Sequence, residues 1–234
     1  MVESLSNYGI QNEQAVTDTN GVVLGHYYTI RGGNGGIYIP ANISDVSAVV
    51  TCLPGCADYG PHVSGTGTTQ YSEYINEILS GNAPDYIVCF NYDDSTPGLS
   101  LDVVNAAINN GANITNVGVM DFSWSGQAGM MMGGQVSAQY PNMDVRIANI
   151  DAALLDAYNQ HVASMQSGNT HSSLDPIRAN IDNQVLVVSI IPDECGWENE
   201  QEYLHQVQVL GENGHNSYLI LSNASSHGEF KRNL

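Results

Sequence analysis

Positive charge is what this sequence has least of. Its 234 residues include five Lys and Arg against 24 Asp and Glu, which gives a formal net charge of −19 at pH 7. A surface this negative repels the phosphate backbone of nucleic acids and anionic membrane lipids. We therefore expect neither as a partner, and strongly anionic substrates are disfavoured for the same reason.

Long apolar runs are also absent. None approaches the ~20 apolar residues that a membrane-spanning helix needs, so no membrane span is expected. The N-terminal stretch MVESLSNYGIQNEQ has neither the basic nor the apolar region of a secretory signal peptide. A cytoplasmic protein is the default expectation, although low charge with abundant Asn, Ser, Thr, Gly and Tyr also suits an extracellular or viral origin.

Cysteine is scarce, with four in the chain. Cys52 and Cys89 lie inside apolar, strand-like runs and are predicted to be buried free thiols. Cys52 and Cys56 have no second pair at zinc-site spacing, so no structural metal is expected, while a disulfide between these two stays open.

Acidic side chains offer one alternative metal site. Asp93 and Asp94, together with Asp58, would suit a hard cation such as Ca²⁺. Acidic turns at strand ends are common in proteins without a metal, so we predict neither a metal nor a cofactor.

The sequence does contain a regular alternation of apolar and amphipathic segments. Strands are expected at 21–30, 36–40, 47–53, 85–92, 116–122, 144–150, 184–191 and 217–222, and helices at 68–81, 100–111, 125–141, 151–166 and 198–214. Strands separated by helices imply right-handed crossovers and a mostly parallel sheet. Runs such as VLVVSII are apolar throughout, as strands covered on both faces require.

The fold class follows from this pattern. We predict one α/β domain over residues 1–234, with a mostly parallel central sheet and helices on both faces. The first two predicted strands flank the Gly-rich stretch RGGNG, which is typical of a β-hairpin. These two strands are therefore expected to pair antiparallel at one edge of the sheet.

Polar residues follow the carboxyl ends of several predicted strands, which is where sites form in such sheets. The sequence SWSG (123–126) follows the strand at 116–122, Asp193 follows the strand at 184–191, and His227 comes after the last strand. A serine hydroxyl is a weak nucleophile until a neighbouring base takes its proton. A histidine can be that base, and a carboxylate can orient the imidazole and stabilise its charged form.

A serine, a carboxylate and a histidine in this chain order resemble the catalytic triad of the α/β-hydrolase family. The resemblance runs from the strand at 47–53 to the final histidine and implies a serine hydrolase of esterase or lipase type without a cofactor. It assigns Ser123 as the nucleophile, Asp193 as the acid and His227 as the base. Glu194 and Asp151 are the alternative acids.

The same resemblance implies an oxyanion hole made of backbone N–H groups. Trp124 follows the nucleophile and supplies one donor. Cys56 supplies the other from the Pro54-Gly55-Cys56 loop, which stands where the family often has His-Gly-x. Tyr59 and His62 from the same loop are candidates for the substrate pocket, and the helix expected to begin near Ser125 adds its positive N-terminal end.

Two serines compete for the role of nucleophile. The family pattern G-x-S-x-G requires small residues two positions before and after the serine. Ser123 at the centre puts Asp121 and Ser125 at those positions, whereas Ser125 at the centre puts Ser123 and Gln127 there. The strand ends at residue 122, which favours Ser123, and Asp121 in place of glycine is a departure from the family. Either serine would also serve as an ordinary helix N-cap.

The predicted reaction is cleavage of a carboxylic ester, or a related acyl bond, through an acyl-enzyme. The chain between 150 and 184 holds one helix and a short loop, so no large lid is expected and the substrate is a small or polymer-borne ester. Two other interpretations stay open: an acyltransferase with the same triad, and a non-catalytic module of the same fold, which Asp121 and the Pro54-Gly55-Cys56 loop suggest. The oligomeric state is not predicted.

Overall fold

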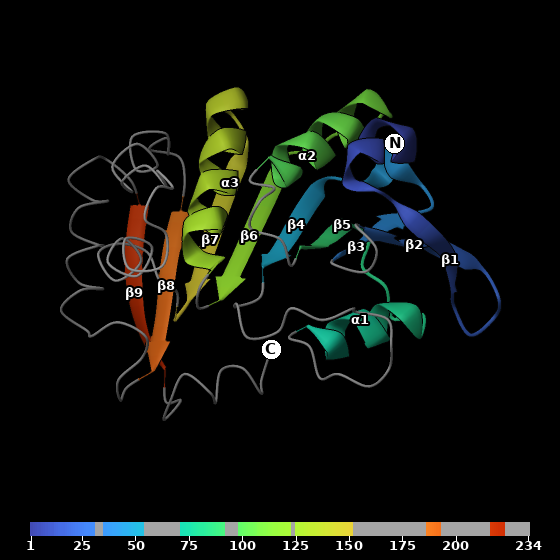
Figure 1. Ribbon diagram of the computed structural model, residues 1–234, viewed down its shortest axis with the longest axis horizontal. Coiled ribbons are helices and arrows are strands. Elements are labelled where there is room, and N and C mark those ends of the chain that lie inside the picture. Colours follow the sequence, from blue (N-terminus) through green and yellow to red (C-terminus); the bar gives the residue numbers. More distant parts are fainter. Residues whose placement is uncertain are drawn as a thin grey trace, which may run out of the picture.

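The computed structural model describes residues 1–30, 35–53, 71–91, 98–122, 125–151, 186–192 and 216–222. These residues form a nine-stranded sheet in the order β1-β2-β3-β5-β4-β6-β7-β8-β9 (Figure 1). The strands are β1 (Gln11–Thr17), β2 (Val23–Ile30), β3 (Gly35–Pro40), β4 (Ala48–Leu53), β5 (Ile87–Asn91), β6 (Asn116–Phe122), β7 (Asp144–Ile150), β8 (Leu186–Pro192) and β9 (Asn216–Ser222).

Five helices are described: the 3-10 helices η1 (Val2–Tyr8) and η3 (Ile43–Asp45), and the α-helices α1 (Ser72–Leu79), α2 (Leu99–Asn109) and α3 (Gly126–Gln139). The three α-helices confirm the predicted helices at 68–81, 100–111 and 125–141. The helices expected at 151–166 and 198–214 lie outside the described residues. None of the described helices is long and apolar enough to cross a membrane.

Strand directions confirm a mostly parallel α/β sheet. From β5 through β4 to β9, every neighbouring pair is parallel, whereas β1, β2, β3 and β5 pair antiparallel in that order. The predicted hairpin forms between β2 and β3. It does not make the edge of the sheet, because the polar segment QNEQAVT adds β1 outside it.

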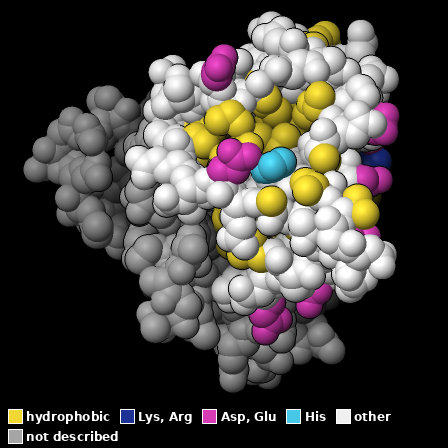
Figure 2. Space-filling view, turned by 90° about the vertical axis from the view of Figure 1, so that its right-hand side faces the viewer, with side chains coloured by type: hydrophobic (Ala, Val, Ile, Leu, Met, Phe, Trp, Pro, Cys, Tyr) yellow, Lys and Arg dark blue, Asp and Glu magenta, His cyan; other side chains and the backbone are white. Residues whose placement is uncertain are grey.

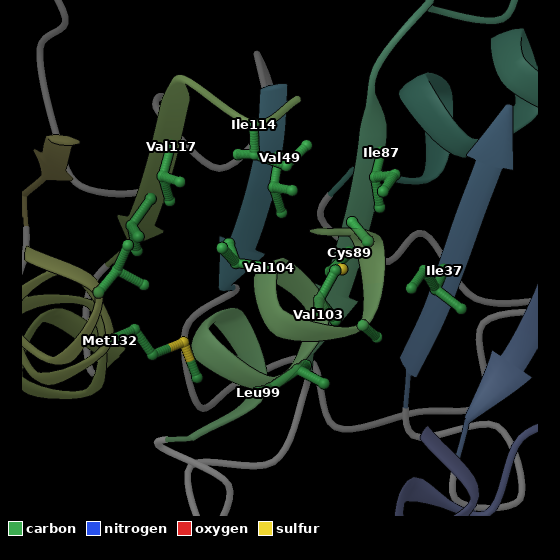
Figure 3. Packing of buried hydrophobic residues seen from close by; sticks show 14 of the residues in the cluster. Ile37, Val49, Ile87, Cys89, Leu99, Val103, Val104, Ile114, Val117 and Met132 are labelled. Carbon is green, nitrogen blue, oxygen red and sulfur yellow. The ribbon is translucent and has the colours of Figure 1, made fainter. Parts of the chain in front are cut away.

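Helices cover both faces of the sheet, as predicted. Helices α2, α3 and η1 pack on one face, and α1 packs on the other (Figure 1). The layer beneath α2 and α3 consists of aliphatic side chains from three strands and both helices (Figure 3): Val49, Ile87, Val117, Val103, Val104 and Met132. Burial of each such side chain contributes ~1.5–3 kcal/mol to folding, and this layer fixes the helices against the strands.

The two described cysteines are buried free thiols, as predicted. Cys89 lies in the layer beneath α2, and Cys52 lies in the layer on the opposite face with α1. Burial raises the pKa of the Cys52 thiol to about 12. A thiol with so high a pKa is protonated at neutral pH and is a poor nucleophile.

The strand order reverses around β4. From β4 the chain passes to β5 on one side and then crosses to β6 on the other side. The connections that leave β4 and β6 therefore diverge at their carboxyl ends, where ligands bind in open α/β sheets. Those ends are Leu53 and Phe122, and Leu53 lies directly opposite Asp121 in the β4–β6 register.

Candidate active site

The predicted site residues occupy the chain just beyond the described strands, outside the described residues themselves: Ser123, Trp124, Cys56, Tyr59, His62, Asp193 and His227. Their sequence positions follow β4, β6, β8 and β9, which all run parallel, so the carboxyl ends of these four strands lie at the same edge of the sheet. Ser123 directly follows the end of β6, and Asp193 directly follows the end of β8. The three segments that contain the predicted triad residues thus all start from strand ends at the same edge of the sheet.

Ser125 is the first described residue after this turn, and its hydroxyl is deeply buried. The side chain is 1% exposed. Its Oγ lies 3.0 Å from the carbonyl oxygen of Leu53 and 3.0 Å from that of Phe122, and it accepts a hydrogen bond from the Phe122 N–H at 3.1 Å. Ser125 occupies the N-cap position of α3, yet its side chain bonds the strand ends rather than the helix. A hydroxyl held in this way belongs to the framework beneath the turn.

Asp121, the departure from the family pattern, is accommodated by the helix that follows. The side chain of Asp121 is fully buried at the end of β6. A Cβ at Gly129 of α3 would lie 2.0 Å from Asp121 Oδ2 and 2.8 Å from its Cγ. The carboxyl group therefore fills the space that a helix side chain would take. Gly129 in the helix, rather than a glycine at the end of the strand, leaves the space that this close approach requires.

Asn149 is the polar partner of Asp121. The two residues lie opposite each other in the β6–β7 register, and both are fully buried. With its Nδ2 turned toward β6, Asn149 donates to Asp121 Oδ2 at 2.6 Å and to Oδ1 at 3.0 Å. With the amide turned the other way, Nδ2 donates to the sulfur of Met130 at 3.8 Å, and the amide oxygen faces the Asp121 carboxyl group.

Burial also affects the protonation equilibrium of Asp121. Removing the Asp121 carboxyl from water raises its pKa well above the ordinary value, because desolvation disfavours the charged form. The orientation in which Asn149 Nδ2 faces β6 supplies two hydrogen bonds to this carboxyl group. The site thus contains a buried acid beneath the turn, held by an amide.

Asp151, one of the alternative acids, directly follows β7 in a constrained conformation. It is fully buried, and its φ of 42° lies in the left-handed region that a non-glycine residue seldom adopts. Its backbone N–H donates to the carbonyl oxygen of Ile190 in β8 at 2.7 Å. Asp151 stays the alternative acid to Asp193, and Glu194 lies outside the described residues.

Metal-binding geometry is absent from the described part of the chain. No group of three or more His, Cys, Asp or Glu side chains gathers there at a distance that could hold an ion. Asp58, Asp93 and Asp94 fall outside these ranges, so the alternative cation site stays an expectation.

Three residues of this region were not foreseen from the sequence: Asn149, Gly129 and Leu53. The polar Asn149 inside the apolar run DVRIANI was the one available signal. Its link to Asp121 depends on the register between β6 and β7, which a single sequence does not specify.

Known proteins resemble this chain in fold but not in sequence. No family model matches the sequence, and no curated protein matches it either. Several solved structures share the fold. A proposed dienelactone hydrolase from Klebsiella pneumoniae matches with a TM-score of 0.56 and 11% identity, over 95% of this chain and 89% of its own.

Two further structures agree. The esterase LipW from Mycobacterium marinum matches with a TM-score of 0.52 and 13% identity, over 97% of this chain and 76% of its own. An acylaminoacyl peptidase from Pyrococcus horikoshii matches with a TM-score of 0.53 and 12% identity; 95% of this chain is covered, but only 38% of the peptidase. All three proteins have the α/β-hydrolase fold, and so does this chain.

Proposed function

We propose that this protein is a serine hydrolase that cleaves a carboxylic ester through an acyl-enzyme intermediate. One observation carries the proposal: Ser123 directly follows β6, α3 begins at Gly126, and this turn adjoins β4 where the strand order reverses. In this fold the nucleophilic serine occupies the sharp turn between a strand and a helix. The esterase and the peptidase of similar fold add support to the hydrolase assignment.

The proposed mechanism uses three side chains. His227 takes the proton from the Ser123 hydroxyl as the oxygen attacks the ester carbonyl. Asp193 holds the imidazole and stabilises its positive charge. The tetrahedral oxyanion accepts hydrogen bonds from the backbone N–H groups of Trp124 and Cys56. His227 then gives the proton to the leaving alcohol.

Deacylation reverses the proton transfers. Water loses a proton to His227 and attacks the acyl-enzyme, the acid product leaves, and Ser123 regains its proton. The positive N-terminal end of α3, a helix of 14 residues, favours the negative charge that develops at the turn. No step requires a metal or a cofactor.

The proposed substrate class depends on the net charge of the protein and on the segment that connects β7 to β8. A net charge of −19 disfavours polyanionic substrates, so we propose a neutral or cationic ester. We propose that the connection between β7 and β8 carries no large lid, so that the site is open and suits a small ester or one carried on a polymer.

Fluorophosphonate labelling followed by peptide mapping tests the proposal. We expect one adduct, on Ser123, and hydrolysis of short p-nitrophenyl esters by the wild type. Ser123→Ala should lose both the adduct and the hydrolysis. The matched control is Ser137→Ala, because Ser137 is a buried serine of α3 away from the turn. An adduct on Ser125 would keep a hydrolase but transfer the nucleophile. No adduct on the folded protein would favour the non-catalytic module.

Product analysis separates hydrolysis from acyl transfer. With an ester substrate and added alcohols, a hydrolase releases mainly the free acid, whereas an acyltransferase yields mainly the new ester. A dominant new ester would replace hydrolase by acyltransferase and leave the triad in place.

A further inference from the structure

We propose that Ser125 is a positioning residue that holds the two halves of the oxyanion hole in register; this inference rests on the proposed function. One buried hydroxyl contacts both strand ends from which those halves begin. Its Oγ lies 3.0 Å from the Leu53 carbonyl oxygen of β4 and within 3.1 Å of both backbone polar groups of Phe122 in β6.

Each contact leads directly to a proposed donor. Leu53 is the last residue of β4, and the loop that begins after it carries Cys56. Phe122 is the last residue of β6, and the turn after it carries Ser123 and Trp124. A shift of either strand end would therefore displace one donor relative to the other.

The hydroxyl acts where the backbone ladder stops. The β4–β6 register ends at the pair Leu53 and Asp121, and Ser125 Oγ adds a link just beyond that pair. The side chain also closes the turn on itself, because Phe122 and Ser125 stand on either side of the nucleophile. At 1% exposure, water cannot replace the hydrogen bonds of a missing hydroxyl.

This geometry predicts an effect on the transition state rather than on substrate binding. Oxyanion donors act only when they point at the position that the oxyanion will occupy, and small displacements weaken them greatly. Loss of a whole donor costs about 100- to 1,000-fold in kcat. For Ser125→Ala, which displaces donors without removing them, we expect a loss of about 10- to 100-fold in kcat, with KM changed less than about twofold.

The experiment compares wild type, Ser125→Ala, Ser125→Gly and the control Ser137→Ala. Three quantities are measured: kcat and KM on one p-nitrophenyl ester, the rate of fluorophosphonate labelling at Ser123, and the affinity for an aryl trifluoromethyl ketone. The ketone forms a hemiketal oxyanion on the nucleophile, so its affinity depends on the oxyanion hole. Thermal unfolding establishes that each variant is folded.

We expect kcat, labelling rate and ketone affinity to fall together in both Ser125 variants, with KM and Ser137→Ala near wild type. Equal kcat and ketone affinity in Ser125→Ala and wild type would overturn the inference. So would a rise in KM alone. If Ser125→Ala does not fold, Ser125→Cys decides in the same way, because its weakly donating thiol predicts an intermediate loss of kcat.

Failure of the proposed function has a different signature. A wild-type protein that gives no adduct and no ester cleavage defeats the hydrolase proposal itself. If Ser123 is labelled at the same rate in wild type and in Ser125→Ala, only the positioning role of Ser125 is contradicted. An adduct on Ser125 in the wild type makes that residue the nucleophile and overturns both assignments.

Discussion

Two parts of the sheet contain polar clusters that differ in their exposure to water. At the carboxyl ends of β4, β6 and β7, Ser125, Asp121 and Asn149 are all buried. At the β1 edge, Glu13 accepts a hydrogen bond from Tyr28 at 3.2 Å and lies 2.8 Å from His26 Nδ1; the Glu13 side chain is exposed, and His26 and Tyr28 are half-buried. Figure 2 shows a histidine beside acidic and hydrophobic side chains on the face that includes this edge.

The comparison teaches that burial, rather than the number of contacts, decides what a polar cluster can do. Water competes for the exposed Glu13 carboxylate at the β1 edge, so its contacts are worth little. In the buried cluster each missing partner leaves an unsatisfied group, so those contacts restrict the backbone to one arrangement. The two clusters should therefore respond very differently to equivalent substitutions.

The largest effect is expected from Gly129→Ala. The new methyl group would meet the Asp121 carboxyl, and overpacking of this kind costs about 1–3 kcal/mol of unfolding free energy. Urea unfolding of Gly129→Ala, of Asp121→Gly and of the double variant measures the coupling. We expect Asp121→Gly to rescue most of the loss. An additive double variant would mean that these two residues do not share this space.

Gly133→Ala is the matched control for that substitution in the same helix. Its added methyl would lie 2.5 Å from the Cδ1 and 2.7 Å from the Cγ1 of Ile147, which are side-chain atoms rather than backbone. We expect a smaller loss than for Gly129→Ala, because the Ile147 side chain can rotate, whereas the Asp121 carboxyl is held by Asn149.

The next effect is a pH dependence that originates at Asp121. A carboxyl whose folded pKa is raised stabilises the protein fully below its ordinary pKa, and that stability is lost as pH rises toward the folded pKa. Asp121→Asn stays neutral, so its unfolding free energy should exceed that of wild type increasingly above pH ~4, by at most about 1.4 kcal/mol per pH unit. Urea titrations from pH 4 to 8 measure the difference. A constant difference between the two proteins would show that Asp121 is ionised in the fold.

The smallest effect is expected at the β1 edge. Glu13→Gln removes the charge facing His26, and exposed ion pairs contribute about 0–1 kcal/mol. We expect a change below about 0.5 kcal/mol, which vanishes at 1 M NaCl because salt screens exposed charges. A loss comparable to that of Gly129→Ala would remove the distinction between the two clusters.

The sequence predicted the elements whose apolar residues are themselves diagnostic. Strands β4 and β6 are apolar runs, and α2 ends near the Gly111 signal, so their positions were correct within a few residues. Strand β1 was missed because only Val16 of its residues is buried, which leaves no alternation to detect. Helix η1 was missed because a short 3-10 turn has no helical period long enough to recognise.

The candidate site also has a part that the sequence predicted and a part that it did not. Chain order and strand ends predicted Ser123, Asp193 and His227, and these stay predictions because they lie outside the described residues. The support beneath the turn was not predictable, because Ser125 contacts Leu53 across 72 positions of sequence. Such a contact exists only once β4 and β6 are neighbours, and that adjacency is a property of the topology.

The irregular β1 strand has a consequence for association between molecules. Its pairing with β2 shifts register twice, Asn12 adopts a left-handed φ of 51°, and Glu13 places a charge on the outermost strand. Interrupted, charged edges resist the addition of a strand from another chain, which is the first step toward aggregation. This margin of the sheet is thus protected against intermolecular growth by its own sequence.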